Sequence, residues 1–257
     1  MGKSIAIFNQ KGGVGKTTTA INFSAALAES GKRVLLVDND PQGNLTSGVG
    51  VDKSLLKASI YHVLIDEADI EDVIINTDFE RLDILPGSVD LAGAEIELVD
   101  FDNREFLLKK QLERIKANYD YIIVDCPPSL GLLTINALVA VDTVLIPIQC
   151  EYYALEGVSH LINTFNLVKN RINPDIEIQG VLLSMFDGRT NLSIQVVEEV
   201  KKHFKKYVYG TIIPRNIRLA EAPSYGLPII HYDRKSKGAE AYLDLAEEFL
   251  MLEEEDD

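Results

Sequence analysis

Short runs that are apolar at nearly every position alternate along this chain with longer stretches in which apolar residues recur every three or four positions. The runs are typical of strands buried on both faces of a sheet, and the longer stretches of helices with one apolar face. The runs predict strands near residues 4–9, 33–38, 82–85, 121–125, 143–149, 178–184 and 209–213. The periodic stretches predict helices over residues 17–30, 104–118, 131–140, 154–172, 191–206 and 238–251.

This alternation of strands and helices predicts an α/β fold, a mostly parallel twisted sheet covered by helices on both faces. No linker-like stretch or internal repeat divides the 257 residues, so we expect a single domain over residues 1–250 and an acidic tail over residues 251–257. Residues 45–102 have a less regular pattern, with short apolar patches such as that of residues 60–64, and we interpret them as an irregular insertion.

A glycine-rich segment joins the first predicted strand to the first predicted helix. Residues 9–18 read NQKGGVGKTT. Glycines allow backbone N–H groups to turn inward around an anion, and the start of the helix adds its positive dipole end. Lys16 can then reach terminal phosphates, and the Thr17 hydroxyl can ligate Mg²⁺. The segment therefore predicts the phosphate-binding loop of a P-loop NTPase-like domain.

The loop departs from the usual G-x-x-x-x-G-K-[ST] pattern in an informative way. Gln10 stands where that pattern has its first glycine, and an additional lysine, Lys11, precedes the glycine pair. A second lysine is one more cation than a single phosphate cradle needs. We interpret it as a residue that serves a second nucleotide.

Acidic residues stand at the ends of two further apolar runs. Asp38 ends the run of residues 33–38 and is followed by Asp40, and Asp125 ends the run of residues 121–125. Carboxylates at the carboxyl ends of parallel strands point into the crevice where ligands bind. Asp125 fits the residue that holds Mg²⁺ through water, and Asp38 and Asp40 fit the outer shell of the metal and the positioning of the attacking water.

Charge is distributed unevenly along the chain. The net charge is −15, but residues 60–105 hold fourteen acidic and two basic residues, and residues 239–257 hold nine acidic and no basic ones. Residues 167–238 hold twelve Lys and Arg against seven Asp and Glu. Because binding to a polyanion depends on the local surface, the composition permits nucleic-acid binding that is weak and sensitive to salt.

The cysteines, the histidines and the lengths of the apolar stretches limit the classes of protein to which the chain can belong. Cys126 and Cys150 form no disulfide framework or metal spacing, and we expect both to be buried. The four histidines are scattered and predict no metal cluster. We find no signal peptide, and no apolar stretch approaches the roughly 18 residues of a membrane span. A cytoplasmic protein is expected.

Six segments of the chain resemble ParA/Soj-type chromosome (or plasmid) partitioning ATPases, which belong to the deviant Walker A class of P-loop proteins. They read KGGVGKTT at 11–18, DNDPQGN at 38–44, DCPPSLG at 125–131, QCEYYALEG at 149–157, DGRTNL at 187–192 and IPRN at 213–216. The resemblance extends from about residue 2 to residue 250. The loop alone would fit several sister families, whereas segments 149–157 and 187–192 are typical of the partitioning branch.

The resemblance implies an enzyme that hydrolyses ATP to ADP and phosphate with Mg²⁺, in a homodimer that ATP closes face to face. Lys11 would reach the nucleotide of the partner subunit, Gly12 would lie at the subunit contact, and Asp40 would position water. The implied catalytic residues are Lys11, Lys16 and Asp40, and the implied metal site comprises Thr17, Asp38 and Asp125. The implied nucleotide-binding residues are Lys11, Gly12, Gly13, Val14, Gly15, Lys16, Thr17, Thr18, Pro214 and Asn216.

The same resemblance implies partners. Arg189 and Arg218 match positions that bind double-stranded DNA without sequence specificity, so a nucleoid-associated protein is expected. The second partner would be a ParB/Spo0J-type centromere-binding protein, and no membrane attachment is expected. We expect no N-terminal helix-turn-helix extension, and therefore not the specific operator binding of longer relatives.

Three alternatives share the lysine-bearing loop. A MinD-like division-site ATPase attaches to membranes through a basic C-terminal helix, but this chain ends in EEEDD, which anionic lipid would repel. A nitrogenase iron protein needs cysteines placed to bridge a cluster between subunits. A small-molecule ligase or kinase needs a second substrate, which no feature of the sequence indicates.

Overall fold

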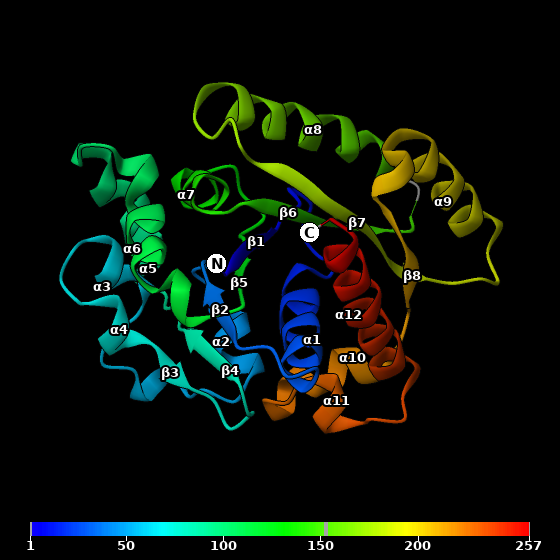
Figure 1. The fold of residues 1–257 in the computed structure, drawn as a ribbon, viewed down its shortest axis with the longest axis horizontal. Helices are drawn as coiled ribbons and strands as arrows, with labels where there is room; N and C mark the ends of the chain where they lie inside the picture. The colour runs from blue at the N-terminus through cyan, green and yellow to red at the C-terminus, as the bar shows by residue number, and fades with distance from the viewer. Residues whose placement is uncertain (1, 152–153, 257) are drawn as a thin grey trace.

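The computed structural model describes residues 2–151 and 154–256. Within them, eight strands form one sheet in the order β3-β4-β2-β5-β1-β6-β7-β8 (Figure 1). The neighbouring pairs are parallel except that β3 is antiparallel to β4. The strands are β1 (Lys3–Ile7), β2 (Val34–Asp38), β3 (Ile75–Asn76), β4 (Leu82–Leu85), β5 (Tyr121–Asp125), β6 (Thr143–Gln149), β7 (Glu177–Phe186) and β8 (Val208–Pro214).

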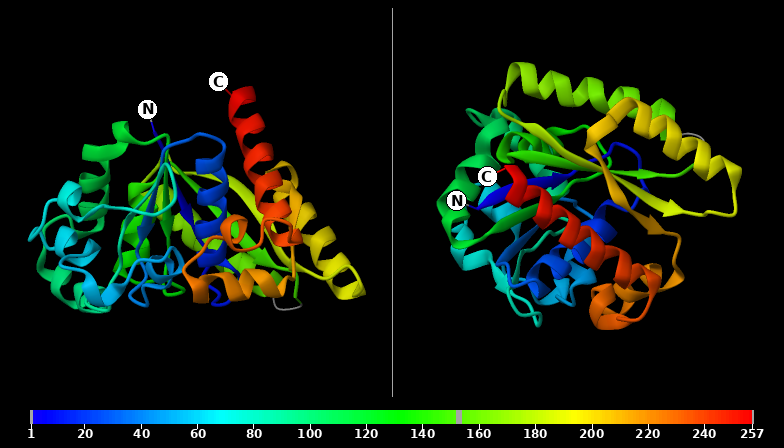
Figure 2. Two further views of the ribbon diagram at one scale, coloured as in Figure 1. Left: turned by 90° about the horizontal axis from the view of Figure 1, so that it is seen from below. Right: turned by 45° about the vertical axis from the view of Figure 1, so that its right-hand side comes forward.

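Helices cover both faces of this sheet (Figures 1 and 2). One face packs against α1 (Lys16–Glu29), α2 (Asn44–Gly48), α10 (Ile217–Glu221), α11 (Ile229–Tyr232) and α12 (Lys237–Asp256). The other packs against α3 (Ile60–Leu64), α4 (Ile70–Val73), α5 (Leu91–Glu97), α6 (Leu107–Ile115), α7 (Leu132–Ala140), α8 (Ala154–Arg171) and α9 (Asn191–Phe204). Short 3₁₀ turns are η1 (Lys53–Leu55), η2 (Leu98–Asp100), η3 (Arg104–Phe106), η4 (Lys116–Asn118), η5 (Lys205–Tyr207) and η6 (Ala222–Tyr225).

The apolar runs form strands because both of their faces are buried. In β1, Ile5 and Ile7 pack into the core under α1 and α12, whereas Ala6 packs into the core on the opposite face. Successive side chains of a strand point to opposite faces, so a strand between two helix layers has to be apolar throughout. The predicted α/β class, parallel sheet and two helix layers are therefore confirmed.

Three details differ from the sequence prediction. The helix expected over residues 104–118 is α6 between two 3₁₀ turns, η3 and η4. The segment 45–102, expected to be irregular, forms α2 to α5 and also supplies β3 and β4 to the sheet. Helix α12 continues through the acidic segment to Asp256, where Glu253 accepts hydrogen bonds from Lys3 Nζ (2.6 Å) and Gln179 Nε2 (3.0 Å).

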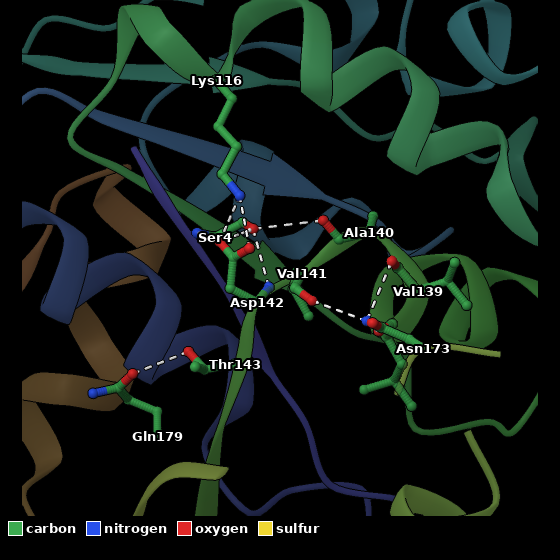
Figure 3. Close-up of polar contacts among 10 residues, drawn as sticks. Ser4, Lys116, Val139, Ala140, Val141, Asp142, Thr143, Asn173 and Gln179 are labelled. Atoms are coloured by element: carbon green, nitrogen blue, oxygen red, sulfur yellow. Dashed lines mark hydrogen bonds and ion pairs between the residues drawn. The ribbon is translucent and has the colours of Figure 1, made fainter. Parts of the chain in front are cut away.

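The amino ends of the strands are joined by polar contacts around Asp142 (Figure 3). Its Oδ2 accepts hydrogen bonds from Ser4 N and Ser4 Oγ, each 2.7 Å, and from Lys116 Nζ at 2.6 Å. These bonds tie β1 and η4 to the start of β6. Both ends of the chain lie on this side of the molecule (Figure 2), which leaves the opposite edge of the sheet to the glycine-rich loop.

Candidate nucleotide-binding site

The loop between β1 and α1 has the backbone geometry that its glycines predict. Gly13 and Gly15 have φ angles of +73° and +92°, in the left-handed region where an L side chain is strained. Ser184 Oγ, at the end of β7, donates a hydrogen bond of 2.8 Å to Val14 O. The loop is therefore fixed from a strand that lies far away in the sequence.

The start of the loop is held by Asn9. Its Oδ1 accepts a hydrogen bond from Lys11 N at 3.0 Å, and its Nδ2 donates to Pro147 O at 2.8 Å. Among the described residues, the Lys11 ammonium has no hydrogen-bond or ion-pair partner, although the main chain at Lys11 is held on both sides. The Lys11 ammonium is therefore available to a group outside the described part of this chain.

Lys16, the first residue of α1, points back into the loop. Its Nζ donates a hydrogen bond of 3.1 Å to Lys11 O, and the residue is buried. Burial lowers the pKa of Lys16, while the nearby carboxyl of Asp125 opposes that shift. A buried ammonium at the start of a helix is suited to bind an anion.

Two carboxylates stand side by side where β2 and β5 end. Asp38 and Asp125 are paired in the register of these strands, and both are fully buried. Burial, followed by the charge of Asp38, raises the pKa of Asp125 to about 8. Asp125 Oδ2 accepts a hydrogen bond of 2.6 Å from Thr17 Oγ1, and Asp125 Oδ1 has no hydrogen-bond partner.

This arrangement fits a magnesium ion. A buried carboxylate oxygen without a partner is costly, and a divalent cation would satisfy it and favour the ionised form. The Thr17 hydroxyl donates its hydrogen to Asp125, so its oxygen lone pairs remain available to a metal. Among the described residues, no group of three His, Cys, Asp or Glu side chains could hold a metal ion.

Asp38 has a second set of contacts. Its Oδ2 accepts hydrogen bonds from Thr46 N at 2.8 Å and Thr46 Oγ1 at 2.6 Å. Burial raises the pKa of Asp38 to about 6, although the bonds from Thr46 oppose the shift. Thr46 Oγ1 in turn accepts a hydrogen bond of 2.9 Å from Gly87 N, which links the end of β2 to the loop after β4.

Asp40 lies two residues beyond β2, at the edge of the phosphate loop. Its Oδ1 accepts a hydrogen bond of 2.9 Å from Gln42 N, which stabilises the turn at Pro41. The residue is half-buried and lines the same cavity as the glycine-rich loop.

Two neighbouring cavities meet at this loop. One, of about 350 Å³, is lined by Gly12, Gly13, Gly15, Lys16, Thr17, Thr18, Asp40, Gln42, Asn44, Pro128 and Met185. The other, of about 370 Å³, is lined by Gly15, Thr18, Ser184, Met185, Ile213, Pro214, Arg215, Asn216, Ile217, Leu219, Ala220 and Tyr242. They share Gly15, Thr18 and Met185. The first is rich in loop N–H groups and the second in apolar side chains, so together they match a nucleotide with its phosphates and its base.

The structure brings most of the expected ATP-site residues to these cavities. Pro214 ends β8, and Asn216 caps α10, where its Oδ1 accepts a hydrogen bond of 2.8 Å from Arg218 N. Asp38 and Asp125 lie behind the first cavity and do not line it.

The two expected DNA-binding arginines do not line the cavities. Each follows the carboxyl end of one of two neighbouring strands, β7 or β8. Arg189 forms a double ion pair with Asp187, with distances of 2.8 and 2.6 Å, and its side chain is 88% exposed. Arg218 Nη1 lies 2.9 Å from Glu221 Oε2. Arg218 Nε also lies 3.4 Å from Asp233 Oδ2. Both guanidinium groups are therefore accessible to solvent but are paired with acidic side chains of this chain.

Several residues at the site were not found from the sequence. Thr46, Ser184 and Met185 contribute through contacts with distant segments, for which the sequence gives no signal. Arg215 lies in the matched IPRN segment and lines the second cavity, and it pairs with Glu151 at 3.1 Å. Tyr152 and Tyr153, which belong to another matched segment, lie outside the described residues.

Both cysteines are buried, as expected. Burial raises the pKa of each thiol. The raised pKa favours the neutral thiol near pH 7, the less nucleophilic form.

Known proteins resemble this chain over nearly its whole length. A family model described as an AAA domain matches residues 2–178. The Bacillus subtilis (strain 168) sporulation initiation inhibitor protein Soj is 64% identical over 248 residues, which cover 96% of this chain and 98% of that protein. The chromosome partitioning protein ParA of Myxococcus xanthus (strain DK1622) is 56% identical, covering 97% and 88%. The chain belongs to the ParA/Soj family of chromosome-partitioning ATPases.

A solved structure adds information on ligands. Cobyrinic acid a,c-diamide synthase from Mycobacterium smegmatis, with bound ADP and magnesium, superposes with a TM-score of 0.85. The two chains are 40% identical, and the superposition covers 96% of this chain and 93% of the synthase. The fold of this ParA/Soj-family ATPase is therefore shared with a protein that holds a nucleotide and magnesium. In the described part of the chain, no helix is long and apolar enough to cross a membrane.

Gly12 of this ParA/Soj-family chain provides a test of the expected subunit contact. A Cβ at Gly12 would meet no atom within 4 Å, and its φ angle is not positive, so a side chain fits within the subunit. We therefore expect Gly12→Val to fold and bind nucleotide normally but to lose ATP-induced dimerisation, with Gly12→Ala intermediate. Thermal unfolding, nucleotide binding and light scattering measure the three properties. Normal dimerisation of Gly12→Val would remove Gly12 from the contact.

Proposed function

We propose that this protein is an ATP-dependent dimerising switch that binds DNA without sequence specificity. It hydrolyses ATP to drive chromosome or plasmid segregation with a ParB/Spo0J-type partner. The observation that carries the proposal is the Lys11 ammonium, which has no partner within the described part of its own subunit. It lies on a loop whose main chain is fixed, so it is ready to contact the nucleotide of a second subunit.

In the proposed complex, ATP occupies the two cavities. The N–H groups of Gly12 to Thr18 surround the phosphates, and Lys16 binds the terminal ones. Pro214 and Asn216 contact the base in the apolar cavity. Thr17 would ligate Mg²⁺, with Asp125 and Asp38 bound to it through water, and the ion would neutralise charge on the phosphates.

Hydrolysis in this proposal is divided between the two subunits. Asp40 of one subunit orients the attacking water, because its carboxylate lines the phosphate cavity and its turn is stabilised by Gln42 N. Lys11 of the other subunit stabilises the negative charge that develops on the transferred phosphate. Each site is therefore complete only in the closed dimer, and hydrolysis reopens it.

DNA binding is proposed for the closed dimer, at the edge that holds Arg189 and Arg218. A single subunit with a net charge of −15 should bind DNA poorly, whereas a dimer presents two copies of a local basic surface to one duplex. This would make the protein nucleoid-associated only while ATP is bound. Binding to random-sequence duplex with ATP, with ADP and without nucleotide tests the proposal, and equal binding in all three states would contradict it.

Charge reversal should identify the DNA-binding surface. We expect Arg189→Glu and Arg218→Glu each to weaken binding to all sequences equally and to leave ATP-induced dimerisation intact. A dimer that loses one phosphate contact in each subunit should show a plot of log affinity against log salt concentration that is less steep by about 2. Filter binding across a salt series measures both quantities.

Arg81→Glu is the matched control for these variants. It makes the same charge change on an exposed arginine, but at the amino end of β4, on the opposite edge of the sheet. Unchanged affinity in both test variants, or a loss in the control as large as theirs, would place the DNA site elsewhere.

A further inference from the structure

Helix α5, together with the turn before it and η2 after it, carries apolar residues on two sides, of which only one is packed. Leu91, Ala94 and Leu98 point inward and are fully buried. On the other side, Val89, Ala92, Ile96 and Val99 recur at spacings of three and four residues and are all exposed. Ile96 is 78% exposed and Val89 75%. We refer to these four residues as the outer stripe.

Single exposed apolar residues are common on protein surfaces, but a stripe at helical spacing is the pattern that a docked helix or peptide covers. Figure 1 shows α5 beside α3 at the side of the molecule, away from the helices that cover the other face. Phe101 and Phe106, just beyond η2, are also partly exposed. Within the described residues, the segment from Val89 to Phe106 therefore carries several apolar side chains that are not packed against the rest of the protein.

The segment that carries the outer stripe is mostly acidic. Residues 90–105 contain six acidic residues and a single basic one, Arg104. Arg104 is paired with Glu105 at 3.2 Å, so it does not offset the others. An apolar stripe with an acidic border is complementary to a basic segment that has an apolar face. It is not complementary to DNA or to anionic lipid.

Two contacts connect α5 with the nucleotide site. At its amino end, Gly87 N donates to Thr46 Oγ1, and Thr46 holds the carboxylate of Asp38. In the middle of α5, Glu95 packs closely against Gly131. A Cβ atom added to Gly131 would lie only 1.7 Å from Glu95 Oε1. Glu95 Oε1 is buried without a hydrogen-bond partner. Gly131 ends the loop that includes Pro128 of the phosphate cavity, so a shift of α5 would move both loops.

We propose that the outer stripe is the docking surface for a basic, amphipathic segment of the ParB-type partner. The proposal rests on the proposed function and specifies where its partner acts. Docking on α5 alters the positions of Thr46, in α2, and of the loop that ends at Gly131, and this is how the partner changes the rate of hydrolysis.

The test uses the double variant Ile96→Ser with Val99→Ser. Both side chains are exposed, so the fold should be retained. The probe is the full-length ParB-type protein from the same genome, titrated into the ATPase with DNA. We expect basal hydrolysis, dimerisation and DNA binding to remain at wild-type values, while the partner concentration for half-maximal stimulation rises about tenfold or more.

Two further variants serve as controls. Leu167→Ser with Leu252→Ser removes two exposed apolar side chains from α8 and α12 and should leave stimulation unchanged. Asp100→Asn with Asp102→Asn retains the stripe and should weaken the salt dependence of stimulation, because fewer charges attract the partner.

The outcomes separate the inference from the proposed function. If the partner does not stimulate the wild-type protein, the proposed partnership is wrong. If it stimulates the wild type and the Ile96, Val99 variant equally, only the docking surface is wrong. If the variant loses ATP-induced dimerisation instead, the outer stripe is a contact between copies of this chain, which also overturns the inference.

Discussion

Lys16→Ala is expected to abolish ATP-induced dimerisation. The Lys16 ammonium is buried at the start of α1 and is the charge that the loop offers to the terminal phosphates. Loss of a charge-assisted hydrogen bond costs about 1.5–3 kcal/mol, so nucleotide affinity should fall roughly 10- to 100-fold. Nucleotide titration and light scattering with ATP and with ADP measure the two effects.

Lys11→Ala is the matched control for Lys16→Ala. Lys16 bonds to the carbonyl of Lys11 and not to its side chain, so the loop should retain its shape. This variant should bind ATP as the wild type does but fail to hydrolyse it. A Lys16→Ala protein that still forms a dimer only with ATP would show that the loop is not the phosphate site.

Asp40→Ala is expected to separate hydrolysis from dimerisation. The carboxylate lines the phosphate cavity, and its hydrogen bond is to Gln42 N and not to the glycine-rich loop, so ATP binding and closure should persist. Loss of the group that orients water should slow hydrolysis by roughly 100-fold or more. Single-turnover hydrolysis and light scattering in ATP test this combination.

Asp40→Asn distinguishes charge from turn geometry. Its side-chain oxygen can still accept the hydrogen bond from Gln42 N, so the turn is retained while the negative charge is lost. We expect it to be as slow as Asp40→Ala. If Asp40→Ala hydrolyses ATP at the wild-type rate, Asp38 becomes the candidate for positioning water.

The sheet and its long helices could be predicted because burial determines their pattern. Strand β2 is buried along its whole length, and its five residues read VLLVD, which no exposed element would have. The two-residue strand β3 and the four-residue helix α4 were missed because elements of this length contain only about one period of their pattern, so no repeat can be recognised. Helix α12 was ended too early, because a run of like charges does not indicate that Glu253 is bonded to Lys3.

The candidate site was predictable where it depends on position within a strand or loop. Asp38 and Asp125 were found because the carboxyl ends of parallel strands meet at one edge of the sheet. Thr46, Ser184 and Glu95 were not found, because their contributions are contacts with Asp38, Val14 and Gly131 in other segments. Such contacts depend on packing, which one sequence does not specify.

The acidic end of α12 and the exposed arginines lie at opposite edges of the sheet. Glu253 is bonded to residues at the amino ends of β1 and β7, whereas Arg189 and Arg218 follow the carboxyl ends of β7 and β8. If the proposed DNA binding holds, a phosphate backbone would repel the acidic end of α12 and attract the edge that holds the two arginines. An encounter with DNA would then favour one orientation of the subunit, in spite of a net charge of −15 that opposes its approach.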